Sequence, residues 1–177
     1  MEKKLIKYTV SVYTEDSVGL LNRISAIFQR RHINIESFNS SMTEIENVQR
    51  WTILVITSES FIKKIVGQIN RQIEVIKAYY HTDEETIYQE SCLFKIKSSL
   101  LFDDRKIQNI IKESNAIIVT VNPEFFVLEK SGRTKELDEL YKKLSSHGIM
   151  QFVRSGRIAV TKQPLMISEI LSKFKSK

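Results

Sequence analysis

Apolar side chains change their spacing along this 177-residue chain, and the same order of changes occurs twice. Alternating apolar and polar residues have the period of a β-strand, whereas apolar residues three and four apart have that of an amphipathic helix. In the first series we expect a strand at 5–13, a helix at 16–31, strands at 32–42 and 48–57, a helix at 58–69 and a strand at 74–80. Residues 4–80 therefore have the predicted order βαββαβ.

A second series follows a polar stretch at 81–91, which we interpret as a linker because it carries four acidic residues. In this series we expect a strand at 92–97, a helix at 104–114, strands at 116–121 and 125–130, a helix at 133–146 and strands at 149–153 and 158–161. A short amphipathic segment after Pro164 is expected to dock on the body of the protein or on a partner. Its apolar residues are Ile167, Ile170, Leu171 and Phe174.

Two βαββαβ units in tandem predict an α+β protein with two ferredoxin-like domains, each an antiparallel sheet with both helices on one face. We place the first domain at 1–80, the linker at 81–91 and the second domain, with a basic C-terminal tail, at 92–177. Each sheet would leave one face uncovered, and large exposed apolar patches usually mark association sites. We therefore expect that face to be covered by the other domain, a second copy of the chain or a different subunit.

Composition excludes several classes of protein. Cys92 is the only cysteine, so a disulfide framework and a cysteine-based zinc site are excluded, and a reducing cytoplasm fits best. No apolar stretch approaches the roughly 18 to 20 residues that span a bilayer, so no membrane association is expected. The 27 basic residues exceed the 21 acidic ones but are interleaved with them, which favours a solvated surface over a nucleic-acid-binding face.

The chain contains no pattern typical of catalysis or metal binding, so we expect no catalytic and no metal-ligating residues. The three histidines lie far apart, and neither a GxxxxGK phosphate loop nor a GxGxxG turn occurs. Cys92 is interpreted as a small core residue. Asp103 and Asp104 are adjacent, but at a helix start they are better explained as an N-cap and as partners of the helix dipole.

One junction does suggest a binding site. In the segment Asp16–Leu21, Gly19 falls at the turn between the first expected strand and its helix, where a side chain would block the approach of a ligand. The N–H groups of this turn have no partner within the helix and can receive a carboxylate. A plainer explanation is equally open: Gly19 only lets the chain turn, and Asp16 or Ser17 only caps the helix.

A second candidate lies at the start of the next strand, which we expect to be close to that turn in a βαββαβ unit. Asn34 could use its amide for an ammonium or a carboxylate, while Ile33 and Ile35 line an apolar slot. The alternative is a turn asparagine beside two core isoleucines.

These residues resemble those of a known family. Similarity to the ACT domain of the acetolactate synthase (acetohydroxyacid synthase) small-subunit family lies in Asp16-Ser17-Val18-Gly19-Leu20-Leu21-Asn22-Arg23-Ile24 and in Asn34-Ile35-Glu36-Ser37. The carboxy-terminal pattern of that family is similar to Gly132–Asp138 and Val153–Val160. The resemblance covers nearly the whole chain, apart from the tail after Lys162.

The resemblance implies a regulatory subunit without an active site or cofactor of its own, which forms a homodimer through its ACT domains and binds valine between them. It would activate a large catalytic subunit that uses thiamine diphosphate, magnesium and usually FAD to condense two pyruvates, or pyruvate with 2-oxobutyrate. That reaction stands early in valine, leucine and isoleucine biosynthesis, and valine would inhibit it by feedback. The effector-binding residues carried over are Asp16, Ser17, Val18, Gly19, Leu20, Asn34 and Ile35.

The chain departs from the family pattern at two places. Valine-sensitive members often have asparagine where this chain has Asp16. The second domain has no glycine at its equivalent turn, residues 100–104, so we expect it to contact the large subunit and not to bind an amino acid. Two alternatives are an amino-acid-sensing ACT protein of another enzyme and an RNA-binding module, although no Lys/Arg-Gly-Phe/Tyr-Gly/Ala-Phe segment occurs.

Overall fold

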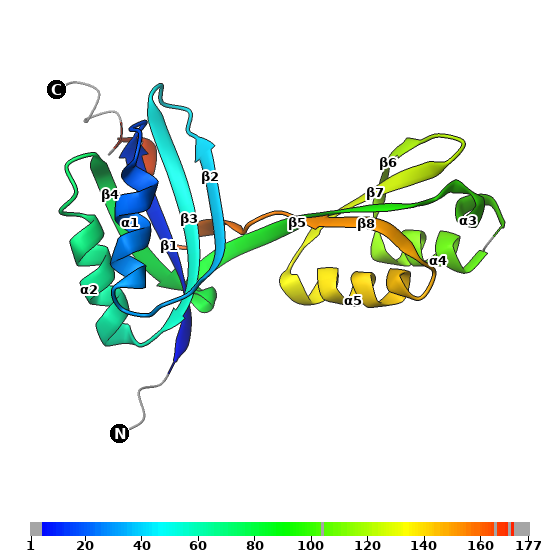
Figure 1. Ribbon diagram of the computed structural model, residues 1–177, viewed down its shortest axis with the longest axis horizontal. Coiled ribbons are helices and arrows are strands. Elements are labelled where there is room, and N and C mark those ends of the chain that lie inside the picture. Colours follow the sequence, from blue (N-terminus) through cyan, green and yellow to red (C-terminus); the bar gives the residue numbers. More distant parts are fainter. Residues whose placement is uncertain (1–4, 104, 165, 170, 172–177) are drawn as a thin grey trace. The chain divides into compact units, whose positions relative to one another are not determined.

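The computed structural model describes residues 5–103, 105–164, 166–169 and 171 (Figure 1). The chain forms two compact units, which are described separately. Unit 1 comprises Met1–Tyr88 together with Arg157–Lys177, and unit 2 comprises Gln89–Gly156. No helix among the described residues is long and apolar enough to span a bilayer.

Unit 1 contains a four-stranded antiparallel sheet with two helices on one of its faces (Figure 1). Its elements in chain order are β1 (Ile6–Glu15), α1 (Leu20–Gln29), β2 (Ile35–Met42), β3 (Val48–Thr57), α2 (Glu59–Ile69), β4 (Val75–Thr82) and the short 3₁₀ helix η1 (Asp83–Glu85). The strand order β2-β3-β1-β4 places β1 and β3 in the centre. This is the βαββαβ arrangement that the apolar spacing predicts.

The side of this sheet that faces the helices is apolar, and the apolar faces of the strands and helices pack against each other there. Tyr8, Val10 and Val12 of β1 are at most 3% exposed and belong to one core with both helices. The buried residues of α1 are Leu20, Ile24, Ile27 and Phe28. Because each period gathers apolar side chains on one side of its element, sheet and helix bury each other's apolar surface.

The opposite face of the unit 1 sheet is covered in part by the chain's own C-terminal segment. β5 (Thr86–Lys97) follows η1 directly, and β9 (Ile158–Thr161) pairs with β5. Further along, Leu171 is fully buried with Tyr13 of β1 and Val48 of β3. This face is therefore covered in part by residues that the prediction assigned to the second domain and its tail.

The predicted linker at 81–91 is also wrong, because regular structure runs through it. β4 extends to Thr82, η1 carries a capping box between Thr82 and Glu85, and β5 begins at Thr86. The polar residues that suggested a loop instead satisfy the backbone of a tight turn, which is a common use of Thr and Glu at helix starts.

The predicted second domain at 92–177 is too long. Residues from Arg157 onward belong with unit 1, although β9 itself is a strand as predicted. β9 pairs with β5 and is the fifth strand of the sheet that also contains β6, β7 and β8, so its predicted place in the second sheet is confirmed even though the residues from Arg157 group with unit 1. Of the predicted docking residues, Ile167 and Leu171 pack on unit 1, whereas Ile170 and Phe174 lie outside the described residues.

Unit 2 repeats the βαββαβ order with an additional helix. After β5 its elements are α3 (Ser98–Asp103), α4 (Arg105–Ser114), β6 (Ile117–Val121), β7 (Phe125–Gly132), α5 (Thr134–Ser145) and β8 (Ile149–Arg154). The antiparallel sheet has the order β6-β7-β5-β8, and its buried core includes Phe94, Ile107, Phe126, Leu128, Leu137, Leu140 and Leu144. The predicted α+β class with two ferredoxin-like units is thus confirmed. Asp104, one of the two predicted capping residues, lies outside the described residues.

The burial of one face of α1 can be tested with a matched pair of substitutions. Ile24 is 1% exposed, so Ile24→Ala should destabilise the protein by about 2–5 kcal/mol because it leaves a cavity in the core. Leu21 is 47% exposed, and Leu21→Ala should change stability by no more than about 0.5 kcal/mol. Urea unfolding followed by circular dichroism measures both. Equal losses would contradict the described orientation of α1.

Candidate functional site

The loop between β1 and α1 turns at a glycine with a left-handed backbone. Gly19 has a φ of 82° and is the N-cap residue of α1, and no side chain caps this helix. The predicted capping by Asp16 or Ser17 is therefore wrong. A Cβ added to Gly19 would meet no atom within 4 Å, so the space beside this turn is open. The first-turn N–H groups of a helix lack intrahelical acceptors, and this turn can receive an anion.

The other predicted loop residues differ in exposure. Val18 is fully exposed and Ser17 is half-buried. The Leu20 side chain is fully buried in the core, so only the backbone of Leu20 can contact a ligand. Its N–H group donates to the Ser17 carbonyl at 3.5 Å, a long hydrogen bond that leaves the turn loosely closed.

Asp16 is bound to β3 and not to α1. Gln49 donates from Nε2 to Asp16 Oδ1 at 2.7 Å, and Gln49 Oε1 accepts from Trp51 Nε1 at 2.9 Å. The Asp16 backbone N–H donates to the Asn47 carbonyl at 3.0 Å. These bonds hold a carboxylate at the edge of the loop, where it would attract an ammonium group and repel a carboxylate.

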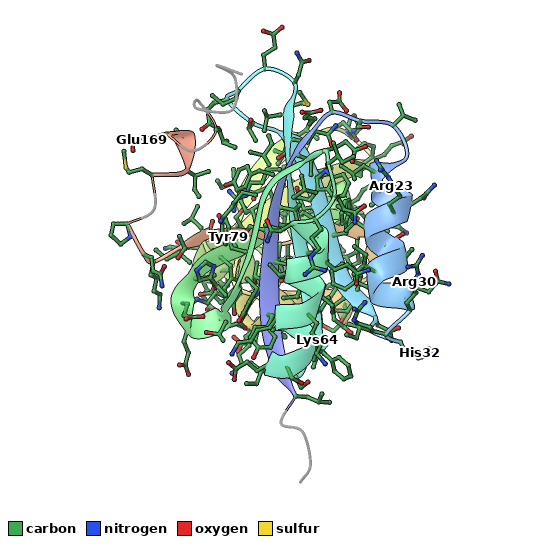
Figure 2. All side chains as sticks on the ribbon, turned by 90° about the vertical axis from the view of Figure 1, so that its left-hand side faces the viewer. Arg23, Arg30, His32, Lys64, Tyr79 and Glu169 are labelled. Atoms are coloured by element: carbon green, nitrogen blue, oxygen red, sulfur yellow. The ribbon has the colours of Figure 1, made fainter. Side chains whose placement is uncertain are left out.

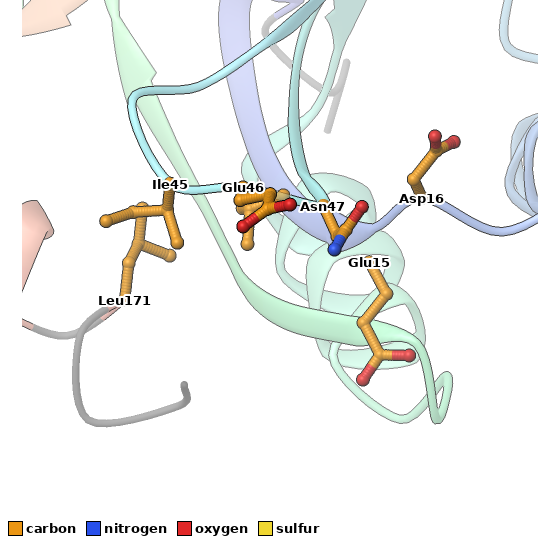
Figure 3. Close-up of a pocket in the computed structure, with 7 residues that line it drawn as sticks. Glu15, Asp16, Ile45, Glu46, Asn47 and Leu171 are labelled. Carbon is orange, nitrogen blue, oxygen red and sulfur yellow. The ribbon is translucent and has the colours of Figure 1, made fainter. Parts of the chain in front are cut away.

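A cavity of about 350 Å³ lies beside Asp16 (Figure 3). It is lined by Glu15, Asp16, Ile45, Glu46, Asn47, Val48 and Leu171. Figure 3 shows Ile45 next to Leu171 at one end and Asp16 at the other. The lining combines carboxylates with aliphatic side chains, which is suitable chemistry for a small molecule that carries both an amine and an apolar group.

Asn34 and Ile35 contribute to a different cavity. This one has a volume of about 470 Å³ and is lined by Ser25, Phe28, Gln29, His32, Ile33, Asn34 and Ile35. The Asn34 side chain is exposed, whereas Ile33 and Ile35 pack partly against the core. Ile33 and Ile35 therefore line a cavity beside Asn34. They also pack against the core, as expected if Asn34 is only a turn residue beside two core isoleucines.

The two halves of the predicted site do not meet within one chain. The Gly19 turn precedes α1 and Asn34 follows it, and a helix of 10 residues is about 15 Å long. Figure 2 shows Arg23 near the start of α1 and His32 beyond its end. The expectation that the start of β2 lies close to the first loop is therefore wrong, because the chain runs the length of α1 between them.

Two residues of the site were missed by reasoning from the sequence. Gln49 orients Asp16 across the sheet, and Leu171 reaches the cavity from the far end of the chain. Neither carries a local signal, since both contacts depend on strand register and on the return of the C-terminal segment. The register that places Gln49 opposite Thr14 is set by the whole length of β1 and β3.

The remaining titratable groups have structural explanations. Arg23 donates from Nη2 to Glu74 Oε1 at 2.5 Å, and this hydrogen bond holds the pKa of Glu74 below its usual range. Burial raises the pKa of the Cys92 thiol, which agrees with its interpretation as a core residue. No group of three or more potential metal ligands is found among the described residues.

Both units match acetolactate synthase small subunits. Residues 10–77 match a family model described as the AHAS small subunit-like ACT domain, and residues 89–163 match one described as the small subunit of acetolactate synthase. An acetolactate synthase small subunit of Mycobacterium bovis is 32% identical over 160 residues, which cover 89% of this chain and 93% of that protein. The chain belongs to the acetolactate synthase small-subunit family.

Further relatives of this family agree with the predicted resemblance. An acetolactate synthase small subunit of Bacillus subtilis is 30% identical over 155 residues, covering 87% of this chain and 90% of its own. The crystal structure of the small subunit from Thermotoga maritima has a TM-score of 0.79 at 21% identity and covers 90% of this chain and 99% of its own, which shows a shared fold. The match across 89–163 argues against an ACT protein of another enzyme.

The left-handed turn can be tested with a second matched pair. Gly19→Ala should destabilise the protein by about 1–2 kcal/mol, because a residue with a Cβ is strained at a φ of 82°. Gly67 lies within α2, and Gly67→Ala should stabilise the protein by about 0.5–1 kcal/mol. Urea unfolding measures the change in the free energy of unfolding of both variants, and the two changes should have opposite signs. A Gly19→Ala variant as stable as Gly67→Ala would show that the turn is not left-handed.

Proposed function

We propose that this chain is the regulatory, non-catalytic subunit of an acetolactate synthase, that it activates a large catalytic subunit, and that it mediates feedback inhibition by valine. The observation that carries the proposal is the open left-handed turn at Gly19, located at the position where the family motif predicts the effector. The family matches over both units support a large subunit as the partner.

In this proposal the carboxylate of valine accepts hydrogen bonds from the N–H groups around Gly19. The carboxylate of Asp16, oriented by Gln49, attracts the ammonium group of the effector. Asp16 then supports recognition of an amino acid even though many valine-sensitive relatives have asparagine there. The isopropyl group enters the apolar slot beside Asn34 and Ile35.

The length of α1 supports a site that is shared between two chains. Valine is far shorter than the helix that separates Gly19 from Asn34, so one chain cannot offer both halves to one molecule. We therefore propose a homodimer through unit 1, in which the Gly19 turn of one chain faces Asn34 and Ile35 of the other. A two-fold dimer of this kind contains two identical sites.

Unit 2 is proposed to contact and activate the large subunit. Thiamine diphosphate, magnesium and FAD are assigned to that subunit, and this chain is assigned no active site of its own. The complex is proposed to act in the cytoplasm, in the biosynthesis of valine, leucine and isoleucine. Valine changes the activity of the complex only if it binds more tightly to one of two states of the dimer.

The proposal is tested by acetolactate formation with the cognate large subunit across a valine titration. This chain should raise the activity, and valine should lower it. Gly19→Asp should abolish the inhibition and keep the activation, because its carboxylate repels that of valine. Gly67→Asp, on the exposed side of α2, is the control and should stay sensitive. Full inhibition of Gly19→Asp would place the effector elsewhere, and no activation by the unchanged chain would contradict the subunit assignment.

The two-chain site makes a separate prediction about mixed dimers. Gly19→Asp and Asn34→Ala should each lose valine binding as homodimers, since every site then has one defective half. A heterodimer of the two variants has one site with both defects and one with none, so calorimetry should recover about half of the binding capacity. A site built within one chain would show no recovery.

A further inference from the structure

The chain passes between the two units at two places, and one arginine lies at the second. The chain leaves unit 1 after Tyr88 and returns to it at Arg157. The Arg157 guanidinium lies over the Tyr88 ring, 3.6 Å from its centroid. Arg157, the first residue of the returning segment, thus contacts Tyr88, the last residue before the chain enters unit 2. This cation–π contact joins both crossing points on the side of unit 1.

Arg157 is anchored in unit 1 by three further contacts. Its Nη1 donates to Asp83 Oδ1 at 2.5 Å and to Thr9 Oγ1 at 3.1 Å, and its backbone N–H donates to Ser37 Oγ at 3.1 Å. The side chain is 1% exposed. The guanidinium and the backbone N–H of Arg157 together fix the start of the C-terminal segment to β1, β2 and η1 of unit 1.

The anchor is incompletely satisfied. Nε and Nη2 of Arg157 are buried and find no hydrogen-bond acceptor among the described residues. Buried donors without acceptors cost free energy, so the docked position of Arg157 is less stable than a fully paired one would be.

From Arg157 the segment follows the sheet face opposite the helices. Arg50 donates to the carbonyl of Ala159, the Lys162 N–H donates to the Glu85 carbonyl at 2.9 Å, and Ser168 donates to Glu44 Oε1 at 2.8 Å. The hydrogen bonds therefore continue from the crossing point to the turn between β2 and β3.

The far end of the segment reaches the effector loop. Leu171 is fully buried against Tyr13 and Val48 and lines the cavity that Asp16 also lines. The segment that begins at Arg157 thus contacts the crossing point at its start and lies beside the Asp16 cavity at Leu171.

We propose that the segment Arg157–Leu171 transmits effector binding at the Asp16 loop to unit 2, with Arg157 as the positioning residue. Binding beside Asp16 changes the packing of Leu171, and the segment carries that change to the incompletely paired guanidinium at the crossing point. Release or tightening of Arg157 there changes the point at which the chain returns from unit 2 to unit 1. The inference rests on the proposed function, because it needs an effector and an activated partner.

The test uses the full chain with its large subunit and separates effector binding from inhibition. In Arg157→Met, valine affinity of the isolated protein should stay within about threefold, and activation without valine should persist. The ratio of activities without and with saturating valine should fall by at least about fivefold, as expected when a coupling is removed. Arg71→Met replaces an exposed arginine of the same unit and should leave that ratio unchanged.

A second variant probes the other end in case Arg157→Met does not fold. Leu171→Ala should also reduce the inhibition ratio, whereas Met166→Ala, at a residue that is 64% exposed, should not. Folding of each variant is checked by circular dichroism. Full inhibition in a folded Arg157→Met or Leu171→Ala variant would overturn the transmission role alone. Failure of the unchanged chain to bind valine would overturn the proposed function together with it.

Discussion

The central strand β1 of unit 1 is buried on both of its faces, and much of the structure follows from this. Tyr8, Val10 and Val12 are covered by the helices, while Thr9, Ser11 and Tyr13 on the opposite face are no more than 5% exposed. A two-layer sheet protein covers only one face of such a strand. The chain supplies the second cover itself, by returning from unit 2 and laying its C-terminal segment across the sheet. Unit 1 is therefore built from two parts of the chain that lie on either side of unit 2 in the sequence.

The same return brings a residue from the end of the described chain next to the loop between β1 and α1. The Gly19 turn and Asp16 belong to the beginning of the chain, yet Leu171 from its end lines the adjacent cavity. The loop therefore has its backbone open to an anion, a fixed carboxylate for a cation, and an aliphatic wall from a distant segment. The proposed effector loop is thereby in contact with the segment that returns from unit 2.

In the proposed transmission, the buried Arg157 acts through the specificity of its contacts and not through their stability. A guanidinium with one carboxylate partner and two unmatched nitrogen atoms contributes less to stability than well-packed apolar side chains would, because desolvation of the charge is only partly offset. The guanidinium does provide specificity. Because it is planar, it can contact Asp83, Thr9 and the Tyr88 ring together in only one orientation. A contact that is specific and only moderately stable is suited to an element that must shift between two states.

The sequence by itself determined the elements, their βαββαβ order in both units, the fold class and the family, because apolar period and a short glycine-bearing motif are local properties of the chain. It also indicated Gly19, Asn34 and Ile35 as candidate effector-binding residues. Only the tertiary structure decided that β9 and Leu171 belong to unit 1, that Gln49 orients Asp16, and that Gly19 and Asn34 lie at opposite ends of α1. Those facts depend on which strands pair and in which register, and on the length of chain between two points. Such non-local choices are made by packing, which no single segment of sequence encodes.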